Sequence, residues 1–176
     1  MTRPMFLIIW VVFAASIFLL MALAWRARKR RDARFAQPSL GLVGEVIATF
    51  AHAGYVSTTA LGAPLERIAI PGLSFKGWAD VTVLRDGVTI AVTGEHPVEI
   101  ASSQLRGTDA AGGRIGKVVE RDGLSLLRWE SGTDSESRTL ESSFRFDSPA
   151  EQLRFAEAIA EITDLHTNTT QESATR

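Results

Sequence analysis

The 176-residue sequence contains no cysteine and only three histidines, His52, His96 and His166, which stand far apart in the chain. The missing cysteines exclude disulfides, thiolate metal sites and a cysteine nucleophile. The histidine spacing matches no metal-binding pattern. The sequence also lacks a Gly-x-Ser-x-Gly elbow and a Gly-Lys-Ser/Thr phosphate loop. We therefore predict that the protein is not an enzyme and that it binds no cofactor and no metal ion.

Positive charge is scarce outside the N-terminal region. Through residue 34 the chain has seven basic residues and one acidic residue, a net charge of +6. The remaining residues include twelve basic and nineteen acidic side chains, a net charge of −7. A domain with an acidic balance repels nucleic acid phosphates. We therefore exclude nucleic acid as a partner.

One long apolar run is present, from Met5 to Trp25, and its 21 residues include no charge, glycine or proline. As a helix the run would be about 31 Å long, which matches the roughly 30 Å hydrocarbon thickness of a bilayer. The alternative is a cleaved signal peptide, because Ala22-Leu23-Ala24 resembles a cleavage site. The run exceeds the usual length of a signal core, however, and most of the positive charge follows it. We therefore predict an uncleaved transmembrane helix.

The residues after this run predict its orientation. Six basic residues follow within ten positions, and such a cluster stays on the cytoplasmic side under the positive-inside rule. We expect a plasma-membrane protein with its N-terminus outside and its domain in the cytoplasm. A tryptophan at the basic end suits the membrane–water interface. The predicted anchor and topology residues are Trp25, Arg26, Arg28, Lys29, Arg30, Arg31 and Arg34.

Composition divides the chain into five parts. We predict a short N-terminal segment (1–4), a transmembrane helix (5–25), a basic juxtamembrane stem and linker (26–41), a folded domain (42–165) and a polar tail (166–176). The tail has almost no large apolar residues, so we expect it to be disordered.

Strand patterns dominate the predicted domain, and the clearest is a hairpin from Ala79 to Thr93. Asp86-Gly87 suits a two-residue turn with positive φ at both positions. Counting outward from this turn sets Val83 opposite Ile90. The alternation then places the apolar residues of both strands on one face of the hairpin.

Other segments also read as strands. A second hairpin is predicted from Ile115 to Glu130, with its turn at Arg121-Asp122-Gly123. Its strands are apolar on both faces, which predicts a central position or cover by a helix. Residues 43–52 fit either a helix or a strand. Further strands are predicted at Gly54–Ala60, Leu65–Ile70, Pro97–Ala101 and Thr139–Phe146.

One helix closes the predicted domain. Ser148, Pro149 and Glu151 stand at the N-cap, first and third helical positions of a capping box. An apolar stripe of one-sided helical spacing follows. Its central residues are Phe155, Ile159 and Ile162, and Leu153, Ala156 and Ala160 are expected to widen it. Such a face suits a helix that lies across the mouth of a small barrel.

These elements predict a mainly β fold with a C-terminal α-helix, a small barrel or sandwich preceded by one transmembrane helix. The order of elements looks like the pleckstrin-homology-like (PH-like) architecture. The segments GYVSTTALGAPLERIAIPGLSFKGWADV, VVERDGLSLLRW and SSFRFDSPAEQLRFAEAI resemble a family of actinobacterial single-pass membrane proteins with a bacterial PH-like domain. Members are loosely labelled as transporters or export proteins. The resemblance implies the fold, and it supplies no catalytic or binding residue.

Two functions fit this organisation. The first is a membrane-anchored cytoplasmic module that binds a protein partner at the inner membrane surface, through a sheet edge or a groove beside the terminal helix. The alternative is a domain that binds a small molecule or a lipid headgroup at the inner leaflet. A transporter is disfavoured, because one transmembrane helix without an intramembrane polar site builds no pore by itself.

Overall fold

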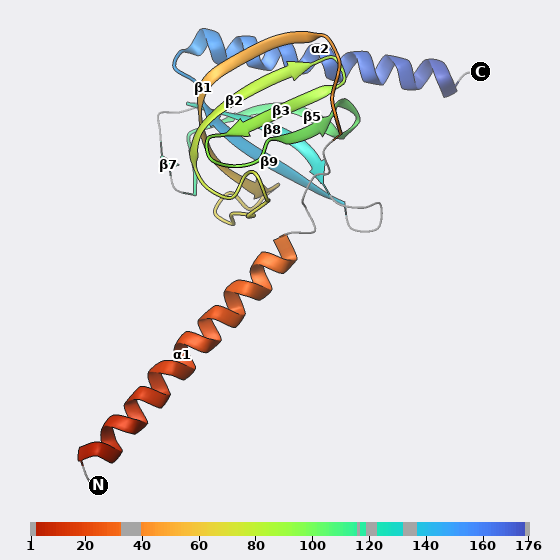
Figure 1. Ribbon diagram of the computed structural model, residues 1–176. Coiled ribbons are helices and arrows are strands. Elements are labelled where there is room, and N and C mark those ends of the chain that lie inside the picture. The colour runs from red at the N-terminus through yellow and green to blue at the C-terminus, as the bar shows by residue number, and fades with distance from the viewer. Residues whose placement is uncertain (1–2, 33–39, 116, 119–122, 132–136, 175–176) are drawn as a thin grey trace. The chain divides into compact units, whose positions relative to one another are not determined.

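The computed structural model describes residues 3–32, 40–115, 117–118, 123–131 and 137–174. The chain divides into two compact units, Met1–Arg34 and Phe35–Arg176. The first unit contains helix α1, Arg3–Asp32 (Figure 1). Within the described residues, one helix is long and apolar enough to cross a membrane, and its apolar part is Ile8–Ala27. By length and composition, α1 can therefore span a bilayer.

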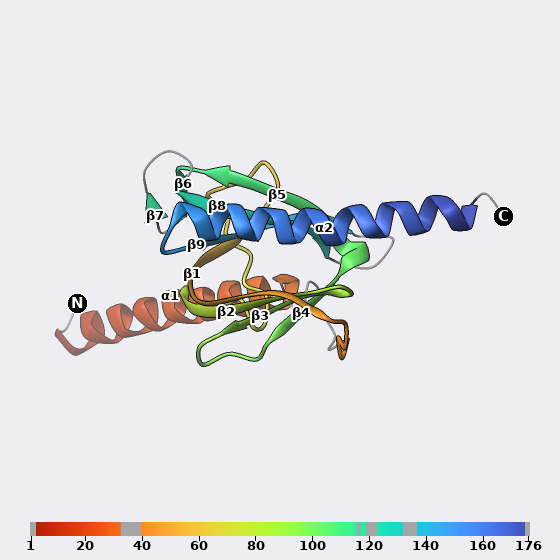
Figure 2. The ribbon, with the colours of Figure 1, turned by 90° about the horizontal axis from the view of Figure 1, so that it is seen from above.

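In the described part of the second unit, seven strands form an antiparallel sheet in the order β4-β3-β2-β1-β9-β8-β5. Strand β1 belongs to both halves of this sheet, because its first part pairs with β2 and its second part pairs with β9. Figure 2 shows the two halves as layers, with helix α2 lying along the end between them. The strands are β1 (Val46–Ala60), β2 (Gly77–Leu84), β3 (Gly87–Val92), β4 (Val98–Ala101), β5 (Leu105–Ala111), β8 (Leu124–Ser131) and β9 (Arg138–Arg145).

Three short elements complete the domain. The 3-10 helix η2 (Ser102–Gln104) joins β4 to β5, and β6 (Gly113–Arg114) pairs with β7 (Lys117–Val118) in a separate two-stranded sheet. Helix α2 runs from Pro149 to Ala174. The predicted fold class, mainly β with a C-terminal helix, is confirmed. Most of the segment 43–52, which fitted either a helix or a strand, belongs to β1.

The core lies between the two layers of the sheet and beneath α2. Phe155 of α2 is fully buried, and its ring centroid lies 5.1 Å from that of Phe146 and 5.6 Å from that of Phe50. Ile159 is also fully buried, as is Ile162 one turn later. The predicted central stripe of the helix is therefore confirmed. Leu153 is 61% exposed and Ala160 is also exposed, so the expectation that these two residues widen the stripe was wrong.

The start of α2 follows the predicted capping box with one difference. The backbone N–H of Glu151 donates to Ser148 Oγ at 3.2 Å, and the Glu151 carboxylate accepts from the backbone N–H of Asp147 at 3.2 Å. The glutamate thus bonds the residue before the N-cap. The helix continues to Ala174 and thus extends into the polar tail predicted from residue 166. No proline or glycine follows Pro149 in the chain, and none is therefore present to end the helix earlier.

The hairpin of β2 and β3 has the predicted apolar face with a different register. Val81 pairs with Ile90 and Val83 with Val88, so the two turn residues are Arg85 and Asp86. The predicted Asp86-Gly87 turn was therefore wrong. A Cβ atom on residue 87 would lie 2.2 Å from the carbonyl oxygen of Ile100 in β4. The glycine is needed for this close strand approach, whereas the sequence suggested a turn with positive φ. The shift by two positions keeps the same side chains on the buried face.

The second predicted hairpin was also wrong. Strand β8 pairs with β5 on one side and β9 on the other, and β7 pairs with β6. The predicted turn residues Arg121 and Asp122 lie outside the described residues. The prediction that this strand is central is confirmed. Both faces of β8 are apolar because Trp129 enters the core while Leu126 is buried on the opposite face.

The segment Leu65–Ile70 forms no strand, so that prediction was wrong as well. It makes an isolated bridge between Arg67 and Thr59, and Ile68 donates its backbone N–H to the carbonyl oxygen of Thr58 at 2.9 Å. Ile68 and Ile70 belong to the core. The apolar alternation therefore reflects a loop that packs two side chains into the domain, since proline residues on both sides limit regular pairing.

A network of hydrogen bonds links β1, β9 and β8 to the loop between β1 and β2 inside this core. The Tyr55 hydroxyl donates to the carbonyl oxygen of Leu73 at 2.9 Å and lies 2.9 Å from Thr58 Oγ1. The Thr58 hydroxyl lies 2.8 Å from Ser142 Oγ, which also accepts from the indole N–H of Trp129 at 3.0 Å. Burial raises the pKa of Tyr55 far above its ordinary value, so the phenol stays protonated. The buried polar side chains of this network are thus paired with one another.

Candidate interaction surface

A strained bulge in β1 opens the candidate surface. The pairing of β1 with β2 shifts between Phe50 and Ala53, and His52 has a φ of 61°. Among the residues that the structure describes, His52 is the one non-glycine with positive φ. The backbone N–H of His52 donates to Asp80 Oδ1 at 3.0 Å. A left-handed residue of this kind costs on the order of 1–3 kcal/mol, and such strain concentrates at functional sites.

The bulge presents an aromatic pair to solvent. The ring of His52 stacks on the indole of Trp78, with 4.8 Å between the centroids and 23° between the planes. Trp78 is 53% exposed although it is the largest type of apolar side chain. Asp80, on the strand face opposite the valines, is exposed and bonds the backbone N–H of His52. Stacked aromatic groups that are held in place at a surface suit a binding contact.

A glycine separates this aromatic pair from a cation. Gly54 pairs with Trp78 on β2 and with Arg145 on β9, so the three residues form one row across the sheet. A Cβ atom on residue 54 would lie 3.6 Å from Arg145 Cβ and 3.9 Å from the Trp78 ring. The missing side chain therefore leaves a gap about one methyl group wide between the indole and the arginine.

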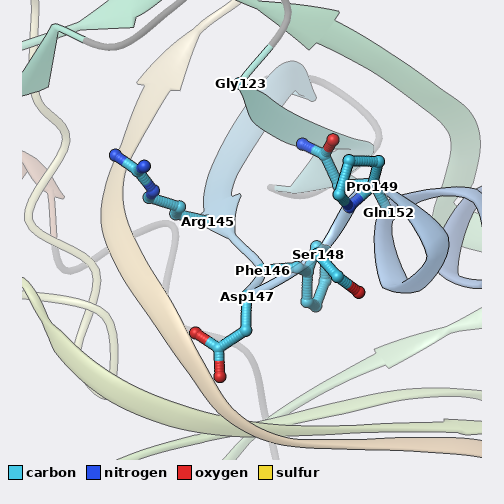
Figure 3. Close-up of a pocket in the computed structure, with 7 residues that line it drawn as sticks. All are labelled: Gly123, Arg145, Phe146, Asp147, Ser148, Pro149 and Gln152. Atoms are coloured by element: carbon cyan, nitrogen blue, oxygen red, sulfur yellow. The ribbon is translucent and has the colours of Figure 1, made fainter.

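Arg145 also lines a shallow hollow beside the start of α2. The hollow has a volume of about 210 Å³, and Figure 3 shows Arg145 of β9 on one side of it and Gln152 of α2 on the other. Its lining residues are Gly123, Arg145, Phe146, Asp147, Ser148, Pro149 and Gln152. The hollow and the aromatic pair share Arg145, and together they form the candidate interaction surface. A guanidinium, an amide and a carboxylate in this hollow can bind polar groups of a partner.

The side chains of this surface offer stacking and hydrogen bonding. Within the described residues, no three His, Asp or Glu side chains stand close enough together to hold a metal ion. The arginine and the aromatic pair offer charge-assisted hydrogen bonds and stacking.

Sequence reasoning named other residues, and the structure locates only some of them. Trp25 and Arg26 are exposed on α1. Arg28, Lys29, Arg30 and Arg31 lie on the same helix, and Arg34 lies outside the described residues. The interaction surface itself was missed, because a β-bulge and its positive φ leave no signal in a strand pattern. The position of Trp78, two residues before Asp80 and therefore on the same face of a strand, was the one available hint.

The sequence matches the family model described as bacterial PH domain-like over residues 36–160. No curated protein matches the chain. The matched residues cover all seven strands of the sheet and the first part of α2. With this match and the observed fold, the chain belongs to the bacterial PH domain-like family.

Proposed function

We propose that the protein is a membrane-anchored interaction module whose PH-like domain binds a protein partner at the inner membrane surface. The observation that carries this proposal is the exposed Trp78, which is held against His52 by a strained bulge. Partner-binding residues of this kind are typically aromatic side chains and arginines in fixed positions. Arg145, which lies on the other side of Gly54 from Trp78 in the same row of the sheet, supplies the arginine.

The size of the hollow favours a protein over a small molecule. Pockets for small ligands usually enclose about 300–1,000 Å³ and bury most of the ligand. The hollow beside α2 is smaller, at about 210 Å³, and shallow. It can accept a side chain of a partner while the aromatic pair and the gap at Gly54 contact neighbouring residues of the same segment. Binding of a small molecule or lipid headgroup is therefore the second candidate.

Anchoring strengthens a weak contact. A transmembrane helix confines the domain near the bilayer, so the local concentration of any membrane-associated partner rises. The surface can then work with modest intrinsic affinity. The net negative charge beyond residue 34 also disfavours close contact with anionic lipid.

We expect cells to capture a partner through this surface. Crosslinking in intact cells should recover a protein with the whole chain, and Trp78→Ala should reduce that recovery about tenfold or more, because an exposed aromatic anchor is lost. Phe75→Ala is the matched control, since Phe75 is also aromatic and is 73% exposed but lies outside the surface. Residues 1–41 alone serve as the background. If they capture the same proteins as the whole chain, the domain is not the recognition element.

The proposed topology has a separate test. We expect the basic residues from Arg26 to Arg34 to keep the C-terminal side of α1 in the cytoplasm. A phosphatase that is active only outside the cytoplasm should therefore give no signal when it is fused to Arg176. Fusion of the same enzyme before Met1, behind its own export signal, provides the positive control. A strong signal from the C-terminal fusion would reverse the orientation.

A further inference from the structure

The residues that lead into the domain are held by two carboxylates. Residues 40–45 form neither a helix nor a strand. Glu99 Oε2 of β4 accepts the backbone N–H groups of Leu40 at 2.6 Å and Gly41 at 2.8 Å. Asp86 Oδ2 of the β2–β3 turn accepts those of Val43 and Gly44, each at 2.9 Å. Four amides of an irregular segment are thus bonded to two charged side chains, and such bonds are stronger than neutral ones.

Two glycines make this close fit possible. A Cβ atom on residue 44 would lie 2.4 Å from Asp86 Oδ1. A Cβ atom on residue 87 would lie 2.9 Å from Leu42 Cδ1, in addition to its clash with β4. The segment therefore lies flat against the turn and β4, with Leu42 packed over the glycine. Neither glycine has positive φ, so these positions are glycine because of space and not because of backbone conformation.

From these contacts we infer that Asp86 and Glu99 form a carboxylate clamp, which binds residues 40–44 and limits how far the domain can reach from the membrane helix. Eight residue steps separate Asp32, the last residue of α1, from Leu40. Such a chain spans at most about 29 Å. If the clamp is open, the first fixed residue is Glu45, whose carbonyl oxygen accepts the backbone N–H of Arg85 at 3.0 Å, and the maximum span becomes about 47 Å. The clamp therefore shortens the maximum reach by about 20 Å.

The clamp leaves the candidate interaction surface free. The Asp86 turn is at one end of the β2–β3 hairpin and Trp78 is at the other, about 20 Å away along β2. Residues 40–44 therefore lie at the end of the sheet that is remote from the proposed partner site. A short tether at one end and a binding surface at the other suit a domain that receives a partner within a defined distance of the membrane helix.

Hydrogen exchange on the full chain in lipid nanodiscs tests the clamp without a partner. The amides of Leu40, Gly41, Val43 and Gly44 should be protected in the wild type. Glu99→Ala should speed exchange at Leu40 and Gly41 about 10- to 100-fold, because a bond to a charged acceptor is lost. Gly44→Ala should speed amide exchange at Val43 and at the substituted position to a similar extent, although both carboxylates remain. Glu45→Gln is the matched control, since this neighbouring carboxylate pairs with Arg85 and holds no amide of the segment.

A distance measurement tests the effect on reach. The chain has no cysteine, so Ala27→Cys and Thr93→Cys place two spin labels on exposed positions of the two units. The upper limit of their distance distribution should lengthen by up to about 20 Å when Glu99→Ala and Gly44→Ala are combined, and it should stay unchanged in Glu45→Gln. Unprotected amides in the wild type, unchanged exchange in both single clamp variants, or an unchanged distance distribution in the double variant would each overturn the inference. Exchange in β8 and β9 reports separately whether a variant remains folded.

Discussion

Phe155→Ala should lower the free energy of unfolding of the domain by about 3–5 kcal/mol, the usual cost of removing a fully buried phenylalanine. The ring has no exposed surface and lies 5.1–6.0 Å from three other phenylalanine rings, Phe50, Phe144 and Phe146. These rings come from β1, from β9 and from the residue after β9. An alanine would therefore leave a cavity where the helix meets both layers of the sheet. Denaturant unfolding of residues 40–176, which we expect to fold without helix α1, measures the loss in the free energy of unfolding.

The same helix offers a matched control for this prediction. Leu153 lies two residues before Phe155 and is 61% exposed. Leu153→Ala also removes an apolar group from the same turn, but from an exposed position, and it should change the free energy of unfolding by less than about 0.5 kcal/mol. If the two variants lose equal stability, α2 does not pack on the domain through the Phe155 face.

Glu141→Gln should lower the free energy of unfolding nearly as much as Phe155→Ala, because it leaves a buried positive charge without its partner. The Glu141 carboxylate is 5% exposed and lies between two arginines on the outer face of β9. Arg114 Nη2 donates to it at 2.9 Å and Arg128 Nε at 3.0 Å. Arg114 is itself only 11% exposed. Removing one member of such a buried pair typically costs about 3–5 kcal/mol. Arg128 retains a second acceptor in Asp109, so the loss falls mainly on Arg114.

An exposed ion pair on the neighbouring strand provides the comparison. Glu130 of β8 accepts two hydrogen bonds from Arg106, with both side chains more than a third exposed. Glu130→Gln should lower the free energy of unfolding by about 0.2–1 kcal/mol, since water screens this pair. Adding Arg114→Met to Glu141→Gln should restore part of the lost stability, because the unpaired charge is gone. If the double variant is no more stable than Glu141→Gln, desolvated charge is not the cause.

Local patterns predicted the elements whose environment is periodic. Alternation along Ala79–Thr93 identified a hairpin and its buried face, because one side of that hairpin faces the core along its whole length. The capping residues and the spacing of Phe155, Ile159 and Ile162 located α2 for the same reason. The apolar run of α1 depends on composition alone, so it needed no knowledge of the fold.

Register and strand partners required long-range contacts. The sequence Asp86-Gly87 is typical of a turn, but Asp86 accepts the backbone N–H groups of residues 43 and 44, and Gly87 lies close against β4. Leu65–Ile70 alternates like a strand, yet it is a loop that buries two isoleucines. Strand β8 pairs with β5, which precedes it by two short strands in the chain. In each case the local residues are compatible with more than one partner, and packing selects among them.

The sequence by itself thus determined the apolar helix with its flanking charge, the mainly β class and the closing helix, because each depends on the order of neighbouring residues. Only the tertiary structure decided the interaction surface and the clamp. His52, Trp78 and Arg145 come from three strands and meet through a bulge and a glycine. Asp86 and Glu99 reach the stem from more than 40 residues away. Such juxtapositions arise from strand pairing across the sheet, and no local pattern specifies them.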